Sequence, residues 1–184
     1  SEVPQKISAF LLGPRGAGKA AFVRSLAEIL DLPFVEISLK DGNLDDELGL
    51  DSPPDFWSGQ KLLIRKEKDP DRDIMSPLTA KILSARDSRG QNYRNPLIFI
   101  DGADGLNRMP RDKVRGALEA LLLELLDADD PRFKFREIGL EIDVSHFVFL
   151  LAGDTGFEVE ALSDRVRYIS FPGYTMEKKL ELAG

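Results

Sequence analysis

Cysteine is absent from the 184 residues, and histidine and tryptophan each occur only once. Without cysteine the chain has no disulfide and no thiolate metal site, which suits the cytoplasm. No apolar run approaches the roughly 18 residues that a membrane helix needs, and the N-terminus lacks the pattern of a signal peptide. We therefore expect a soluble cytoplasmic protein with no membrane partner, cut from a longer chain because it begins at Ser1.

An excess of basic residues is also missing, since 25 Lys and Arg face 32 Asp and Glu and give a net charge of −7. Binding to the phosphate backbone of nucleic acids requires a basic surface, so nucleic acid is not an expected partner. The charge-rich stretch 65–72 mixes both signs and is interpreted as a solvated loop. With 42% hydrophobic residues, the chain can bury one sizeable core.

The first forty residues predict a strand, a loop, a helix and a second strand. Residues 7–12 are an apolar run that ends in a glycine-rich loop, and a helical pattern follows. In that pattern Phe22, Leu26, Ile29 and Leu30 share one face. Pro33 then interrupts the chain before a short β-rich segment at 34–38.

The remaining apolar segments continue this alternation. Strands are predicted at 97–101, 147–152 and 168–171, helices at 77–85, 114–126, 157–164 and 176–183, and a hairpin at 133–144. Strands that alternate with helices indicate parallel pairing. The fold class predicted is therefore α/β, with a central, mostly parallel sheet of five strands flanked by helices.

The glycine-rich loop matches a phosphate-binding pattern, G-x-x-x-x-G-K-[ST], except at its last position. In this pattern small residues let backbone N–H groups surround phosphate oxygens while the lysine reaches the outer phosphates. The candidate nucleotide-binding residues are Gly13, Pro14, Arg15, Gly16, Ala17, Gly18, Lys19 and Ala20. Ala20 replaces the hydroxyl that would hold Mg²⁺, so the pattern predicts nucleotide binding with a weakened metal site.

A second candidate position lies at the end of the strand at 97–101. Phosphate-loop NTPases carry a metal-binding aspartate after such a strand, and Asp101 has that context. A glutamate that activates water would follow it, but the next residue is Gly102. A general base contributes roughly 10²- to 10⁴-fold to a rate, so its loss is large unless a nearby carboxylate such as Asp104 substitutes.

Taken in order, these motifs resemble the large α/β subdomain of an AAA+ ATPase of the Lon protease branch. The segments that carry the resemblance are 95–101 (NPLIFID), 120–127 (ALLLELLD), 139–143 (GLEID) and 162–175 (LSDRVRYISFPGYT). The resemblance implies a P-loop NTPase fold. It implies a nucleotide-binding subdomain over residues 1–174, and the start of a truncated helical lid over 175–184.

The resemblance also implies roles for individual residues. ATP or ADP would bind at the loop, with Asp101 as the metal-binding aspartate, and Arg165 would be the arginine finger that enters a neighbour's site in a ring. Family members have a water-orienting asparagine where Asp154 stands, and a carboxylate there faces phosphate charge. With Ala20 and Gly102, three catalytic polar positions are altered, which favours an ATPase that is severely slowed or inactive.

Two adjacent aromatic residues, Phe56 and Trp57, stand where the Lon branch places an element that grips polypeptide in a central pore. They are candidate substrate-binding residues. The alternative is that both rings fold back onto the core.

Three functional hypotheses follow from these residues. The first is a nucleotide-binding AAA+ module that hydrolyses ATP poorly or not at all and acts as a ring or regulatory subunit. The second is an active ATP-dependent unfoldase of a Lon-type protease. The third is an interaction scaffold that binds no nucleotide. A small-molecule kinase is disfavoured, because no acceptor-site basic residues are evident.

Overall fold

The structure is a computed structural model, and it describes residues 6–39, 77–86, 89–90, 95–108, 113–127, 129–135, 139–155 and 162–173. Within this part of the chain, no helix is both long enough and apolar enough to span a bilayer. The predicted helices at 157–164 and 176–183 fall largely or wholly outside the described residues.

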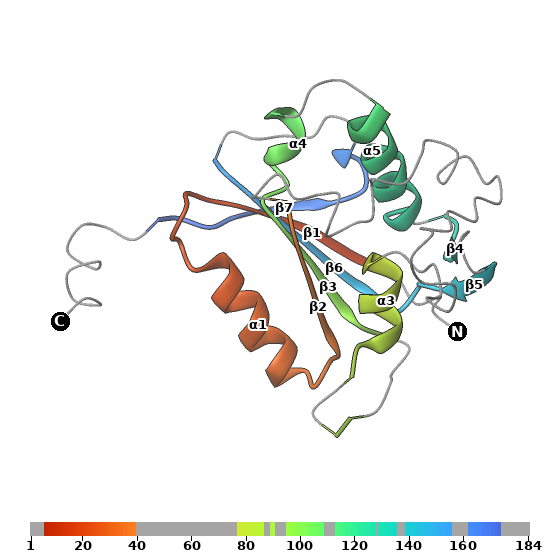
Figure 1. Cartoon of the computed structure of the whole chain (residues 1–184). Helices are drawn as coiled ribbons and strands as arrows, with labels where there is room; N and C mark the ends of the chain where they lie inside the picture. The colour runs from red at the N-terminus through yellow and green to blue at the C-terminus, as the bar shows by residue number, and fades with distance from the viewer. Residues whose placement is uncertain are drawn as a thin grey trace, which may run out of the picture.

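A five-stranded parallel sheet forms the centre of the molecule, in the order β2-β3-β6-β1-β7 (Figure 1). Its strands are β1 (Ile7–Leu12), β2 (Phe34–Ser38), β3 (Leu97–Asp101), β6 (Val148–Gly153) and β7 (Arg167–Ser170). All four pairings between neighbouring strands are parallel. The predicted α/β class and the five core strands are confirmed. The interior strand β3, between β2 and β6, is buried along its whole length, as its continuous apolar run predicts.

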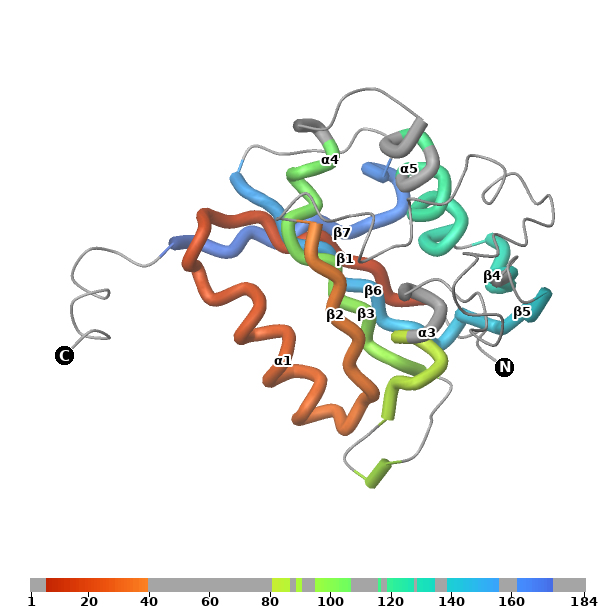
Figure 2. The backbone as a smooth tube through the Cα atoms, in the orientation of Figure 1, coloured from red at the N-terminus to blue at the C-terminus, as the bar shows by residue number. Residues whose placement is uncertain are grey.

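Helices cover both faces of the sheet, which gives three layers (Figures 1 and 2). On one face α1 (Lys19–Ile29) packs against a smaller apolar cluster that includes Leu11, Phe99 and Leu150. On the other face α3 (Pro77–Ser84), α4 (Gly105–Arg108) and α5 (Lys113–Leu125) lie over a larger cluster. The alternation of side chains along each strand sends neighbouring residues to opposite layers.

Of the four residues predicted to form the hydrophobic face of α1, only Leu26 packs against the sheet, where it contacts the smaller apolar cluster. Phe22, Ile29 and Leu30 are all exposed, and the helix instead buries Val23 and Ala27 against the sheet. The buried pair is spaced i, i+4 and made of small residues. Their size lets the helix axis approach the sheet closely, so the larger side chains lie at the flanks rather than underneath.

Outside the main sheet, β4 (Arg132–Phe135) and β5 (Leu140–Asp143) form the antiparallel hairpin that the sequence predicts. Phe133 of this hairpin is buried in the larger apolar cluster. The four-residue helix α4 was not predicted, because its short sequence has no apolar periodicity to reveal it.

Candidate nucleotide-binding site

The candidate site lies at the carboxyl edge of the sheet, where β1, β6 and β3 end side by side. Leu12 is in register with Gly153, and Ala152 is in register with Asp101. The Gly13 N–H donates to the Gly153 carbonyl oxygen at 3.2 Å, which ties the start of the glycine loop to the end of β6. The carboxyl edge of a parallel sheet is where α/β proteins bind their ligands. The fold thus brings together three segments that lie far apart in sequence.

The loop 13–18 turns directly into α1. Gly18 is the N-cap of that helix and has a φ of 84°, a left-handed conformation that glycine adopts without steric cost. The Ala17 N–H donates to the Pro14 carbonyl oxygen at 3.2 Å and closes a tight turn within the loop. No acidic residue occupies the first turn of α1. The helix therefore presents its N-terminal N–H groups and the positive end of its dipole to the loop, an arrangement that favours phosphate.

The Lys19 side chain curls back over this loop. Its ammonium group donates to the carbonyl oxygens of Gly13 and Pro14, the second at 3.0 Å. These contacts hold the cation beside the loop, where it can neutralise phosphate charge. Arg15 is exposed to solvent within the same loop. The geometry fits a nucleotide whose phosphates bind at loop 13–18 and Lys19.

The residues do not fit the usual magnesium site. Position 20 carries a methyl group, so the first turn of α1 supplies no hydroxyl after Lys19. Among the described residues, no three His, Cys, Asp or Glu side chains gather closely enough to hold a metal ion.

Asp101 and Gly102 lie at the end of β3, which is separated by β6 from the strand that leads into the loop. Asp101 is 7% exposed, and its main-chain carbonyl oxygen accepts the Leu39 N–H at 2.8 Å. Gly102 has a φ of 78° and turns the chain sharply at the end of β3. The strand therefore ends at the aspartate, and no acidic side chain follows it at position 102.

Asp154 follows β6 and is partly exposed beside the loop. Its carboxylate accepts the Thr155 N–H at 2.9 Å, so it caps its own turn. Since Gly153 contacts Gly13, Asp154 directly follows the point where β6 meets the glycine loop. Like charges close together repel each other, so Asp154 is poorly suited to holding an attacking water beside a phosphate.

The glycine loop is packed tightly against the exit of β7, a contact that the sequence did not reveal. A Cβ atom at Gly13 would collide with the Phe171 carbonyl oxygen, and one at Gly173 would lie 2.7 Å from the Pro14 side chain. The Phe171 ring in turn contacts Phe22 of α1, with centroids 5.2 Å apart. Two glycines are therefore needed to bring the segments this close.

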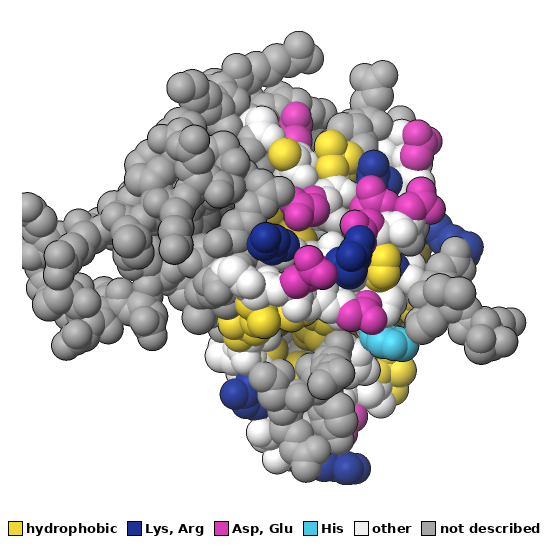
Figure 3. Space-filling view, turned by 90° about the vertical axis from the view of Figure 1, so that its right-hand side faces the viewer, with side chains coloured by type: hydrophobic (Ala, Val, Ile, Leu, Met, Phe, Trp, Pro, Cys, Tyr) yellow, Lys and Arg dark blue, Asp and Glu magenta, His cyan; other side chains and the backbone are white. Residues whose placement is uncertain are grey.

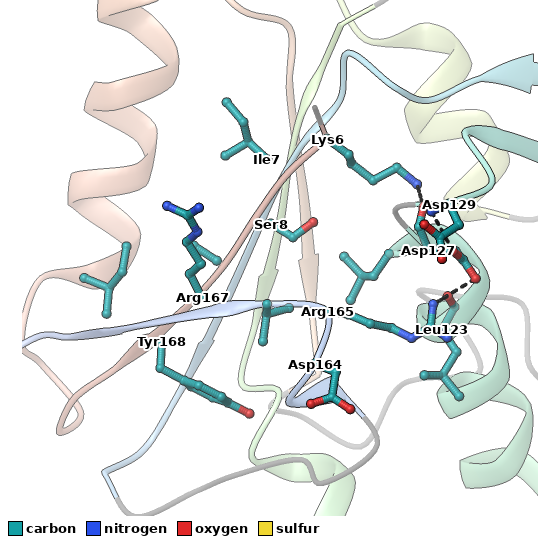
Figure 4. A pocket seen from close by; sticks show the side chains of 14 residues that line it. Lys6, Ile7, Ser8, Leu123, Asp127, Asp129, Asp164, Arg165, Arg167 and Tyr168 are labelled. Carbon is teal, nitrogen blue, oxygen red and sulfur yellow. Dashed lines mark hydrogen bonds and ion pairs between the residues drawn. The ribbon is translucent and has the colours of Figure 1, made fainter. Parts of the chain in front are cut away.

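Arg165 lies away from the loop, just before β7, where it lines a surface groove of about 1050 Å³ (Figure 4). Its guanidinium donates to the Leu123 carbonyl oxygen at 3.2 Å and pairs with Asp127 at 2.9 Å. Lys6 donates to the carbonyl oxygens of Leu125 and Asp127. Two cations thus satisfy the C-terminal end of α5, as helix ends require. Sequence reasoning missed Lys6, whose partners are more than a hundred residues distant.

Hydrogen bonds and burial shift the pKa values of two groups in this groove. The pKa of Asp127 is lowered, chiefly by the hydrogen bond from Arg165 and then by the N–H of Asp129. The pKa of Lys6 is also lowered, because partial burial disfavours its charged form more than the neighbouring carboxylates favour it. The groove lies along the first half of β1, from Ile7 to Ala9, and the glycine loop follows the other end of that strand.

Phe56 and Trp57 lie outside the described residues, so the predicted pore element has no structural description. Acidic and basic side chains intermingle on the face shown in Figure 3, and no broad basic surface is visible there. A mixed surface of this kind suits a solvated face better than a nucleic-acid interface.

Comparison with known proteins agrees with the geometry of the loop and sheet. The sequence model of the ATPase family associated with various cellular activities, AAA, matches residues 9–169. The chain belongs to the AAA family. This match begins within β1, covers the glycine loop and the strands that end beside Asp101 and Asp154, and extends into β7. The family implies that the AAA domain binds ATP or ADP.

Relatives of this AAA domain include several Lon proteases. It is 32% identical to the Lon protease of Aquifex aeolicus over 99% of its length, covering 20% of that protein. It is 32% identical to Lon protease 4 of Sorangium cellulosum and 33% identical to Lon protease 2 of Borreliella burgdorferi. These alignments cover 93% and 94% of the chain, and 18% and 19% of those two proteins. The chain spans about a fifth of these relatives, and it is an AAA+ module that resembles the ATPase module of Lon.

Proposed function

We propose that this chain is a nucleotide-binding AAA+ module that holds ATP or ADP but hydrolyses ATP poorly or not at all. In this proposal it acts as a ring or regulatory subunit. Residues 1–174 form the nucleotide-binding subdomain and 175–184 begin its lid. One contrast carries the proposal: the phosphate cradle is complete at Lys19, while Ala20, Gly102 and Asp154 lack the polar groups that metal binding and water activation need.

The proposed roles divide between two groups of residues. Loop 13–18 and the N-terminal end of α1 bind phosphates through main-chain N–H groups, and Lys19 supplies the cation. Backbone donors of this kind are unaffected by the methyl group of Ala20. Asp101 and Asp154 keep carboxylates near the phosphates, but no neighbouring glutamate or asparagine positions water between them. The nucleotide then acts as a structural or signalling ligand.

Calorimetric titration tests the binding half of this proposal. ATP and ADP are titrated into the chain with and without Mg²⁺, and into Lys19→Ala and Lys134→Ala. Lys134 is an exposed lysine on β4, so Lys134→Ala removes the same positive charge at a position outside the glycine loop. We expect both nucleotides to bind without Mg²⁺, with at least a tenfold loss in Lys19→Ala and none in Lys134→Ala. Absence of binding in the unmodified chain would support the scaffold hypothesis instead.

A phosphate-release assay tests the hydrolytic half. We expect turnover at background level in the chain, both alone and within its parent protein. Turnover that is abolished by Lys19→Ala would contradict the proposal and favour an active unfoldase of the Lon type. In that case polypeptide would be the substrate, with Phe56 and Trp57 as its proposed contacts.

A further inference from the structure

We infer that the main chain at position 102, and not only the residue type there, prevents this site from having a catalytic glutamate. The inference rests on the proposed function and deepens it. Residues 101–106 form a turn that joins the ends of three strands, and Gly102 within it lies in the left-handed region. In that turn, a glutamate at position 102 could not take the place of a water-activating base.

The backbone conformation is the first observation. Gly102 has a φ of 78°, within the left-handed region. Residues with a Cβ atom rarely adopt this conformation, because the Cβ approaches the following carbonyl oxygen. The Gly105 N–H donates to the Gly102 carbonyl oxygen at 2.8 Å, which closes the turn. A glutamate at position 102 would therefore strain this turn or unfold it.

The second observation is that the turn is anchored on both sides of Gly102. Before it, the Asp101 carbonyl oxygen accepts the Leu39 N–H at 2.8 Å, which joins β3 to the exit of β2. After it, the Ala103 N–H donates to the Ala152 carbonyl oxygen at 2.8 Å, which joins the turn to β6. Rotating residue 102 into an extended conformation would break at least one of these bonds, because the two anchors lie on opposite sides of it.

Close packing of the turn is the third observation. Ala103 and Leu106 are fully buried, and a Cβ atom at Gly105 would lie 3.0 Å from the Leu39 carbonyl oxygen. The backbone of Asp104 lies against Gly153, the residue that contacts the glycine loop. The turn thus fills the space next to the phosphate site with main chain and small side chains. An extended strand carrying a glutamate would displace them.

Paired substitutions test this inference through stability. Gly102→Ala and Gly102→Glu are compared with Gly116→Ala and Gly116→Glu. Gly116 is an exposed residue of α5 with open space around it and no positive φ. Its variants therefore introduce the same two side chains at a glycine outside the turn. We expect both Gly102 variants to lower the Tm by several degrees below that of the unmodified chain, and neither Gly116 variant to lower it by as much. Failure of a Gly102 variant to fold while its Gly116 partner folds would be the same result in stronger form.

Two further measurements on variants that carry Gly102→Glu could overturn the inference. In its crystal structure, we expect residue 102 to keep a positive φ or the turn to be rebuilt. An extended residue 102 with the hydrogen bonds of Ala103 and Leu39 intact would refute the inference. In the double variant Ala20→Ser with Gly102→Glu, a tenfold or larger rise in phosphate release at an unchanged Tm would refute it as well.

These outcomes are separable from failure of the proposed function. That proposal is judged on nucleotide binding and phosphate release by the unmodified chain. The turn is judged on the Tm difference between matched variants, which requires no nucleotide. Equal Tm values for Gly102→Ala and Gly116→Ala would overturn the inference even if the chain binds ATP and does not hydrolyse it.

Discussion

The guanidinium of Arg165 lies 2.9 Å from the carboxylate of Asp127, and each side chain is about one-third exposed. The resemblance to AAA+ ATPases makes Arg165 the proposed arginine finger for a neighbour's site. In the single chain it is instead bound to the end of α5, through Asp127 and the Leu123 carbonyl oxygen. Any role in a neighbour's site therefore has to compete with this ion pair.

The ion pair between Arg165 and Asp127 is expected to make the folded chain less stable as the pH falls into the acid range. Hydrogen bonding to Arg165 lowers the pKa of Asp127, so the unfolded chain takes up its proton at a higher pH than the folded chain. The stabilisation is fully present above the unfolded pKa of about 3.9 and is lost as pH falls through the folded value. We expect Asp127→Asn to flatten the fall in Tm below about pH 5, measured by thermal denaturation at several pH values. Asp129→Asn is the control, and an equal effect there would contradict the prediction.

Restoring a hydroxyl at position 20 is expected to restore metal dependence to nucleotide binding. The side chain after the loop lysine normally coordinates Mg²⁺, so Ala20→Ser supplies the missing ligand. We expect Mg²⁺ to increase ATP affinity at least threefold in Ala20→Ser and to have little effect in the unmodified chain, measured by calorimetry. Ala21→Ser places the same group on an exposed position of α1. An equal Mg²⁺ effect in Ala21→Ser would show that the hydroxyl does not act at the site.

Removing the charge of Asp154 is expected to tighten ATP binding more than ADP binding. The carboxylate lies beside the loop end of β6, and repulsion grows with the number of phosphate charges nearby. We expect Asp154→Asn to raise ATP affinity about threefold to tenfold, roughly 1 kcal/mol at a partly solvated site. Asp164→Asn, at the distant groove, makes the same change in net charge. Equal gains in both variants would mean that net charge alone is responsible.

A methyl group at Gly13 is expected to separate the glycine loop from β7. The added Cβ would meet the carbonyl oxygen and Cβ of Phe171, which belong to the main chain and its first side-chain atom and cannot rotate away. We expect Gly13→Ala to lower the Tm by several degrees and to weaken ADP binding, because the loop must shift. Gly116→Ala introduces a methyl group into open space on α5 and is expected to leave both properties unchanged or improved.

The local elements of the fold were predictable because their signals are local. The bounds of β1 and β2 agree with the apolar runs at 7–12 and 34–38, and the hairpin of β4 and β5 agrees with the alternation at 133–144. The buried face of α1 was not predictable from its pattern. Small residues at Val23 and Ala27 pack under the helix, while the larger Phe22 and Ile29 remain exposed, and helical periodicity does not reveal how closely a helix approaches a sheet.

The same division applies to the candidate site. Residue types at 13–20, 101 and 154 were enough to predict a phosphate loop with altered catalytic positions, because that chemistry depends on side chains present or absent. Lys6 and the packing of Gly13 against Phe171 were not visible, since nothing in sequence links residues that lie more than a hundred positions apart. The glycine at position 102 indicates a missing carboxylate. Its backbone conformation adds that the chain itself turns at that point.

The sequence by itself determined the alternation of strands and helices, the glycine loop with Lys19, and the absence of a hydroxyl at position 20. These features follow from the identity of neighbouring residues. Only the tertiary structure decided that β6 lies between the loop strand and the Asp101 strand, and that Arg165 is paired within its own chain. Strand order and ion pairing depend on contacts between distant segments. Such contacts form only when the whole core is packed, so no local pattern encodes them.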